Sequence, residues 1–335
     1  MNTSTELPLA ALKGFLDDQF GRNARFSVEK ISGGQSNPTF FVGHGDKDMV
    51  LRKQPDGPIL KGAHAIDREY RVMRALQSKD VPVPETLLFH DDRALLGTPF
   101  YLMERLEGRV FDDCSLPGLA PKERRGIYLG MAEAMAKMHA VDPKTAGLAD
   151  YGPPGNYFER QVRRWTRQLR ASPGALIPEL ERLADWLAAK LPGDDGHVTV
   201  AHGDFRLGNL MFHPTEPRVI GILDWELSTL GHPLADLGFA CMTWHCAPDE
   251  YGGILGLDLA GLGIPSKAEF VAHYMAHAQP TAQLTDFHVI FALFRFAVIF
   301  VGIADRAKAG NAAGNNVDDL APLARSFALR ALALI

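Results

Sequence analysis

The sequence predicts an α+β fold in two parts, with a strand-rich N-terminal part and a mainly helical C-terminal part. Short apolar runs at residues 26–31, 39–42 and 49–53 are separated by turn residues, which is the pattern of an antiparallel meander. From about residue 122 onward, apolar residues recur every three or four positions, which is the pattern of helices. We therefore divide the chain into residues 1–106 and residues 107–335.

Composition places the chain among ordinary globular proteins with a sizeable core. It has 335 residues, of which 46% are hydrophobic and 22% charged. A formal net charge of −5 argues against bulk nucleic-acid binding. The 3 cysteines cannot all pair and the N-terminus lacks a signal-peptide pattern, so we expect a reducing, cytoplasmic setting. Composition leaves the oligomeric state open.

The most apolar run, residues 287–303, raises the question of a membrane span. Arg295 lies at its centre and His288 near its start. A charge at that depth is costly in lipid. We expect a buried C-terminal helix and no membrane partner.

The N-terminal part begins with a helical pattern over residues 7–20, which Gly21 ends. The turn after the first strand contains five residues of interest: Gly33, Gly34, Gln35, Ser36 and Asn37. Paired glycines let backbone N–H groups face phosphate oxygens. A Gly-Gly pair is also a common hairpin turn, so the pattern leaves both interpretations open.

A helix predicted over residues 64–77 carries a carboxylate on its packed face. Glu69 shares that face with Ile66 and Met73. An unpaired buried charge is expensive, so Glu69 needs a partner, and Arg52 at the end of the third strand is the candidate. Such a pair could hold nucleotide phosphates or could be purely structural.

Two further strands, at residues 85–89 and 99–103, complete the N-terminal part. Helical patterns then occupy residues 122–139, 176–191, 234–244, 267–278, 287–303 and 320–334. His273 and His277 are one helical turn apart, but no acidic third ligand accompanies them in a recognisable motif. We therefore interpret both as surface or core residues.

Four arginines fall on one helical face, at spacings of 0, 3, 4 and 7: Arg160, Arg163, Arg164 and Arg167. A stripe of charge is usually a solvated face. If it has a function, it favours an anionic ligand.

The chemistry of the chain is concentrated in two stretches. Strand 198–200 leads to His202, Asp204 and Asn209, and strand 219–223 leads to Asp224. Carboxylate and amide oxygens are the donors that Mg²⁺ prefers. The spacing matches the catalytic loop and metal-binding aspartate of protein kinases, except that Trp-Glu follows Asp224 in place of Phe-Gly.

Taken together, these motifs resemble the aminoglycoside phosphotransferase-like kinases, which have the two-lobed protein-kinase-like fold. The resemblance spans nearly the whole chain, with Gly33 to Asn37, Arg52, Glu69, the His202 loop and Asp224 in the family's order. The stretches 157–161 and 224–231 are similar to the kinase-like domain of acyl-CoA dehydrogenase family members ten and eleven and its bacterial stand-alone relatives.

The resemblance implies roles for the residues that match the family's motifs. Asp204 would accept the proton of a substrate hydroxyl, and Arg206 would neutralise the phosphoryl group in transfer. Asn209 and Asp224 would hold Mg²⁺. The residues implied to hold ATP are Gly33, Gly34, Gln35, Ser36, Asn37, Arg52, Glu69, Glu104 and Leu106. His202 and Asp236 would brace the loop.

The function implied is transfer of the ATP γ-phosphoryl group to the hydroxyl of a small molecule, in this branch a hydroxyacyl-CoA. An aminoglycoside or another small alcohol is the alternative acceptor, although the arginine stripe suits phosphates better than polycations. A pseudokinase that regulates a partner is a third interpretation, which the filled catalytic positions oppose. The chain lacks Asp-Phe-Gly and Ala-Pro-Glu motifs, which disfavours a protein kinase. The sequence does not decide between ATP and GTP.

Overall fold

The computed structural model divides the chain into two compact units. Unit 1 comprises Met1–Glu107 and Gly221–Glu226, and unit 2 comprises Gly108–Ile220 and Leu227–Ile335. The structure describes residues 7–31, 37–57, 64–174, 177–279, 282–308 and 321–335. The first boundary lies one residue from the one drawn from the sequence. The short segment that carries Asp224 belongs to unit 1.

Unit 1 is a five-stranded antiparallel sheet with helices. Its elements are α1 (Leu9–Phe20), β1 (Phe26–Lys30), β2 (Thr39–His44), β3 (Lys47–Lys53), α2 (Ile66–Gln77), β4 (Thr86–His90), α3 (Arg93–Leu96) and β5 (Phe100–Glu104). The strand order is β1-β2-β3-β5-β4, so the meander predicted for the first three strands is present.

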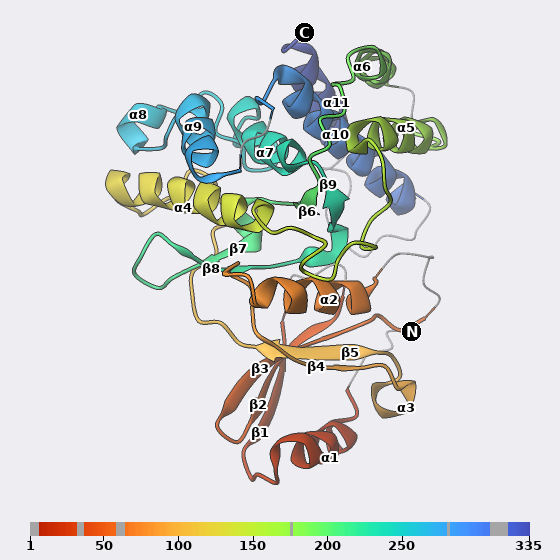
Figure 1. Cartoon of the computed structure of the whole chain (residues 1–335), viewed down its shortest axis with the longest axis vertical. Helices are drawn as coiled ribbons and strands as arrows, with labels where there is room; N and C mark the ends of the chain where they lie inside the picture. The colour runs from red at the N-terminus through yellow and green to blue at the C-terminus, as the bar shows by residue number, and fades with distance from the viewer. Residues whose placement is uncertain (1–6, 32–36, 58–63, 175–176, 280–281, 309–320) are drawn as a thin grey trace. The chain divides into compact units, whose positions relative to one another are not determined.

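The alternation of β3 determines what each face of this sheet contacts. Met49 and Leu51 point to one face, where they join a buried apolar cluster with Leu12 and Leu16 of α1. Arg52 points to the opposite face, where it meets Glu69 of α2. The two helices therefore cover opposite faces of the sheet (Figure 1).

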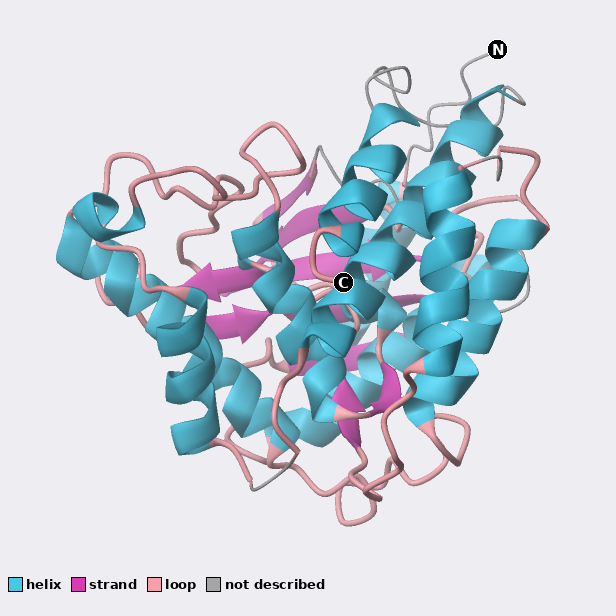
Figure 2. Ribbon diagram, turned by 90° about the horizontal axis from the view of Figure 1, so that it is seen from above, coloured by secondary structure: helices cyan, strands magenta, loops and turns pink. Residues whose placement is uncertain are grey.

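Unit 2 is mainly helical. Figure 2 draws the helices of the whole chain in cyan and its strands in magenta. The larger helices of unit 2 are α4 (Pro121–His139), α5 (Tyr157–Arg170), α6 (Pro178–Ala189), α7 (Pro233–Cys241), α9 (Lys267–His277), α10 (Asp286–Lys308) and α11 (Ala321–Leu332). Shorter helical turns are η1 (Leu207–Asn209), η2 (Trp225–Leu227), η3 (Met242–His245) and α8 (Leu259–Leu262). With the sheet of unit 1, this arrangement confirms the predicted α+β fold.

Two small antiparallel sheets position the loops of interest. β6 (Thr199–Ala201) pairs with β9 (Thr229–Gly231), and β7 (Leu210–Phe212) pairs with β8 (Val219–Ile222). Neither β7 nor β9 is evident in the sequence, because three residues are too few to establish a period of two. The strands that precede the two polar motifs are present where they were expected.

Helix α10 forms the centre of unit 2. Among the described residues it is the one helix long and apolar enough to cross a membrane, and 83% of its most apolar window is buried within the protein. It packs against α5, α6, α7 and α11. Burial of this kind is typical of a core helix and agrees with the expectation drawn from Arg295.

His288, in the first turn of α10, gives a testable pH dependence. The backbone N–H of Thr285 donates to its Nδ1 atom (3.0 Å), and the ring packs edge-on against Phe158. Burial lowers the pKa of His288 from 6.5 to about 4. The folded state therefore binds fewer protons than the unfolded state between these values, and stability is lost as the pH falls from 6.5 towards 4.

Chemical denaturation at a series of pH values measures this effect. We expect the free energy of unfolding to fall less steeply below pH 6.5 in His288→Gln than in the unchanged chain, because Gln does not titrate. Identical slopes for the two proteins would show that His288 does not contribute to acid sensitivity. His245, whose pKa burial also lowers to about 4, remains as a second source in both proteins.

Candidate active site

The loop predicted to be catalytic follows β6 directly. His202 is fully buried, whereas the side chain of Asp204 is 23% exposed. The side-chain amide of Asn209 donates to the Asp204 carboxylate (2.7 Å) and to the Asp204 carbonyl (2.9 Å). Because the NH₂ group is the donor in both bonds, the carbonyl oxygen is the atom that Asn209 can offer to a cation.

Arg206 lies beside Asp204 with part of its donor capacity unused. Its Nε atom is 3.6 Å from the Asp204 carboxylate, and its guanidinium lies over the ring of Tyr251. Among the residues that the structure describes, this buried Nε has no hydrogen-bond partner. A buried donor without a partner is costly, and an anion is the group that would satisfy it best.

Asp236 holds the backbone of the loop. Its carboxylate accepts hydrogen bonds from the N–H groups of His202 (2.7 Å) and Gly203 (2.8 Å), and it contacts Nε2 of His139 (3.2 Å). Burial raises the pKa of Asp236, but the bond from His139 and the neighbouring charges outweigh it and leave the pKa below its ordinary value. The carboxylate is therefore ionised, and it holds the backbone N–H groups of the loop.

Gly203 is required at the turn of this loop. Its φ of +83° lies in the left-handed region, and a Cβ atom there would come within 2.7 Å of the Leu227 carbonyl oxygen. The carbonyl of Gly203 in turn accepts a hydrogen bond from Nη2 of Arg295 (2.5 Å).

The sequence did not assign two residues that support this loop. Arg295 was recognised only as a charge in an apolar run; it lies against the rings of Trp165 and Phe239 and reaches the loop. His139 ends the amphipathic helix α4 and was not singled out. Its Nδ1 atom accepts from the hydroxyl of Tyr274 (2.7 Å), which leaves Nε2–H to donate to Asp236.

In unit 1, Arg52 joins two carboxylates. Its Nε atom lies 2.9 Å from Glu69, so the expected ion pair is present, and its Nη2 donates to Asp224 (2.7 Å). Lys53 points to the other face of the sheet, as the alternation predicts, and its Nζ bonds to the Leu96 carbonyl (3.2 Å). Arg52 therefore contacts Asp224 directly, which the sequence did not indicate.

Glu69 is surrounded by donors. Asn37 Nδ2 (2.7 Å) and the Tyr101 hydroxyl (3.1 Å) bond to its carboxylate in addition to Arg52. Burial raises the pKa of Glu69 to about 7, and the charge of Arg52 opposes that shift. The carboxylate is almost fully buried and holds the guanidinium of Arg52.

Asp224 adopts an unusual backbone conformation. Its φ is +62°, and its side chain is 36% exposed. A residue other than glycine in this region is strained, and such strain is common at functional sites. The next residue, Trp225, is buried and donates its Nε1–H to the Ile222 carbonyl (2.9 Å), which anchors the turn.

The remaining nucleotide-binding candidates receive less support. Gly33, Gly34, Gln35 and Ser36 lie outside the described residues. Asn37 is described, and its side chain already bonds to Glu69 and His64. In the segment predicted to meet adenine, the N–H of Glu104 donates to the Glu85 carbonyl, and Leu106 is partly exposed. The roles of these residues remain predictions.

The four arginines of α5 separate into different surroundings. Arg160 donates to the carbonyls of Pro154 and Gly155, and Arg164 lies over the Trp165 ring. Arg163 and Arg167 line a groove of about 520 Å³, in which Arg163 pairs with Glu159 (2.8 Å). The stripe is therefore partly neutralised, and two of its members face one groove.

A larger cavity of about 1070 Å³ also lies within unit 2. Its lining contains two permanently cationic side chains, Lys144 and Arg160. It also contains four aspartates: Asp142, Asp150, Asp194 and Asp195. Sequence spacing could not reveal this acidic cavity, because its walls come from separate loops, from the start of α5 and from the end of β9.

The fold and the polar residues described above are found in a known family of enzymes. The family model described as "Phosphotransferase enzyme family" matches residues 27–277. The chain belongs to this family of phosphotransferase enzymes.

Three proteins are similar to this chain over nearly its whole length. Acyl-CoA dehydrogenase family member 10 of Mus musculus is 39% identical over 97% of this chain, which spans 31% of that protein's length. The crystal structure of a protein from Ralstonia eutropha JMP134 is 43% identical, with a TM-score of 0.89 over 98% of both chains. The aminoglycoside phosphotransferase APH(4)-Ia, solved with AMP-PNP and hygromycin B, shares the fold at 15% identity, with a TM-score of 0.61 over 96% of this chain and 98% of its own.

Proposed function

We propose that the chain transfers the γ-phosphoryl group of ATP, with Mg²⁺, to the hydroxyl of a hydroxyacyl-CoA. The observation that carries the acceptor class is the 39% identity over 97% of the chain to a protein named for acyl-CoA dehydrogenases. We expect a kinase region that shares a chain with an acyl-CoA dehydrogenase to act on an acyl-CoA thioester as well. The groove lined by Arg163 and Arg167 supports this choice, because CoA carries several phosphates.

In the proposed reaction, the hydroxyl oxygen of the acceptor forms a bond to the γ-phosphorus while the bond from that phosphorus to the ADP oxygen breaks. The proton of the hydroxyl passes to the carboxylate of Asp204, which lies partly exposed at the loop. The Nε–H of Arg206, which has no hydrogen-bond partner among the described residues, then has an acceptor in the phosphoryl oxygens. Arg52, fixed by Glu69, contributes charge to the remaining phosphates.

The two residues predicted to hold Mg²⁺ each carry an oxygen donor that suits a hard cation. Asn209 can offer its amide oxygen and Asp224 its carboxylate, and Mg²⁺ prefers one or two such ligands together with phosphate oxygens and water. The ion would supply neutralisation of phosphate charge. A hydrogen bond from Arg52 holds the carboxylate of Asp224 in place.

A second acceptor class has an observation of its own. The acidic lining of the 1070 Å³ cavity suits a polycation, which is the charge character of an aminoglycoside. The two candidates are therefore distinguished by charge: a CoA thioester would use the arginine groove, and an aminoglycoside would use the acidic cavity.

A coupled assay of ADP release tests the proposal. Hydroxyacyl-CoA thioesters are compared with the corresponding acyl-CoA lacking the hydroxyl, with free hydroxy acids, and with aminoglycosides, choline and sugars, each with ATP and with GTP. We expect acceleration by the hydroxyacyl-CoA alone, and a raised KM for it in the double variant Arg163→Gln, Arg167→Gln. If aminoglycosides alone accelerate ADP release, and Asp194→Asn abolishes that acceleration, the acceptor is an aminoglycoside and not a hydroxyacyl-CoA.

A further inference from the structure

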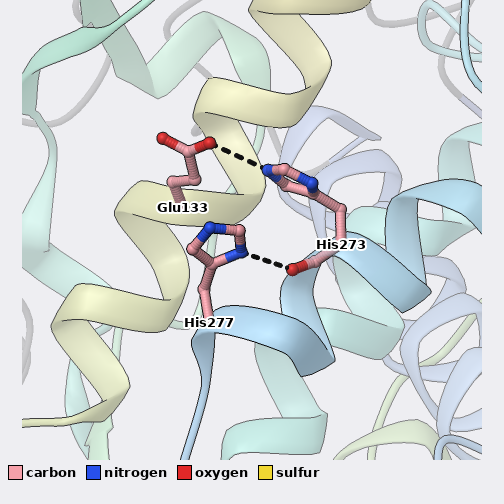
Figure 3. A group of neighbouring side chains, drawn as sticks. All are labelled: Glu133, His273 and His277. Atoms are coloured by element: carbon pink, nitrogen blue, oxygen red, sulfur yellow. Dashed lines mark hydrogen bonds and ion pairs between the residues drawn. The ribbon is translucent and has the colours of Figure 1, made fainter.

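Glu133, His273 and His277 form a cluster that the phosphotransfer reaction does not use. His273 and His277 lie one turn apart on α9, and Glu133 comes from the neighbouring helix α4 (Figure 3). One ligand atom from each residue lies within 4.8 Å of the others. The acidic third ligand that the local sequence lacked is therefore supplied by a helix that is distant in sequence but adjacent in space.

The hydrogen bonds of the cluster set its tautomers. Nδ1 of His277 lies 2.8 Å from the carbonyl oxygen of His273, and since a carbonyl only accepts, Nδ1 carries the proton. The Nε2 atom of neutral His277 then has a free lone pair. Histidines that bind metals almost always donate their other N–H in this way to a carbonyl or carboxylate.

The His273 and Glu133 side chains need to move apart only slightly to bind an ion between them. Nε2 of His273 lies 2.8 Å from a carboxylate oxygen of Glu133. Two ligands on one tetrahedral zinc are about 3.3 Å apart, given metal–ligand distances of about 2.0 Å. The required change is small, and both side chains are partly exposed, at 26% for His273 and 48% for Glu133. Binding at Nε2 of His273 moves its proton to Nδ1.

From these contacts we propose that Glu133, His273 and His277 bind a divalent transition-metal ion, Zn²⁺ in the first instance, which links α4 to α9. Two imidazoles and one carboxylate, with water in the fourth position, suit zinc and its neighbours in the first transition row, whereas Mg²⁺ prefers oxygen ligands alone. The site is therefore distinct in chemistry from the Mg²⁺ site of the kinase reaction.

The linked helices support the catalytic loop. Tyr274, adjacent to His273, bonds to His139 at the end of α4, and His139 contacts Asp236. An ion that holds α4 and α9 together therefore also holds the two residues that meet in the Tyr274–His139 bond. We expect bound Zn²⁺ to raise the melting temperature of the protein.

A second group in unit 2, Asp195, His197 and His232, has comparable spacing but unsuitable hydrogen bonds. Nδ1 of His232 accepts the N–H of Leu234 (3.2 Å), so its Nε2 carries the proton and donates to Asp195. Metal binding at Nε2 would place a proton on Nδ1 against the Leu234 N–H. This group serves as the matched control.

The test measures Zn²⁺ binding to the chain without an affinity tag, after removal of metal with a chelator. Calorimetry and metal analysis after dialysis are expected to show one Zn²⁺ per chain, unchanged by millimolar Mg²⁺, and a higher melting temperature. His277→Gln and Glu133→Gln should weaken binding at least tenfold and remove the thermal shift. His197→Gln should leave both unchanged.

Two results would overturn the proposal. One is the absence of Zn²⁺ binding at micromolar concentrations. The other is binding that survives in His277→Gln and is lost in His197→Gln, which would assign the ion to the second group. Since His277 is exposed, its substitution is expected to leave the fold intact, and circular dichroism of each variant checks this. The outcome does not depend on the identity of the phosphate acceptor.

Discussion

Asp204→Asn is expected to lower kcat for phosphoryl transfer by about 10³-fold, within the range for loss of a general base. The carboxylate is the proton acceptor in the proposed reaction, and an amide cannot take that proton. The substitution is nearly isosteric, and Asn209 can still donate to the side-chain oxygen. Binding of ATP should therefore change little. The comparison needs single-turnover rates together with direct measurement of nucleotide affinity.

Asp18→Asn is the matched control, because Asp18 is an exposed carboxylate on α1. It should leave both the rate and the affinity unchanged. Turnover by Asp204→Asn equal to that of the unchanged chain would remove Asp204 from the chemistry. A parallel loss of nucleotide affinity and rate would instead indicate a structural role for the carboxylate.

The sequence predicted the elements of this site wherever a local pattern carried the information. Glu69 on the packed face of a helix required a cation, and Arg52 at the end of a strand could be named from alternation alone. The structure places the two in contact at 2.9 Å. The fold class followed in the same way, because the strands of unit 1 and the long helices of unit 2 are periodic over enough residues to be recognised.

What the sequence missed depends on contacts between distant segments. His139 and Asp236 are 97 residues apart, and Arg295 reaches a carbonyl 92 residues away. No spacing rule connects such positions. The same limit applies to Glu133, whose helix is far in sequence from His273: the two histidines were judged to lack an acidic partner because only their own helix could be searched.

Asp236→Asn is expected to lower the free energy of unfolding by about 3 kcal/mol, the range for loss of one partner from a buried charged network. The carboxylate meets three donors, from His202, Gly203 and His139. An amide has one acceptor oxygen and presents an NH₂ group in place of the other. At least one donor therefore faces another donor in the interior.

Asp258→Asn is the control, because it makes the same Asp-to-Asn change at an exposed position outside the buried network. Asp258 also accepts a backbone hydrogen bond, from the N–H of Gly261 (3.0 Å), but it does so at an exposed helix start. Because Asn and Asp are equivalent at such positions, the control should change stability by less than about 0.5 kcal/mol. Equal effects of the two substitutions in chemical denaturation would contradict the role assigned to Asp236.

The activity of Asp236→Asn then distinguishes bracing from general stability. Asp236 contacts the backbone of the loop, so its loss displaces Asp204 without removing any reacting group. A displacement of about 1 Å costs roughly 10²-fold in rate. We therefore expect kcat to fall at temperatures where the variant remains folded, with the KM for ATP nearly unchanged. Unchanged kcat under those conditions would mean that His139 and Arg295 hold the loop without Asp236.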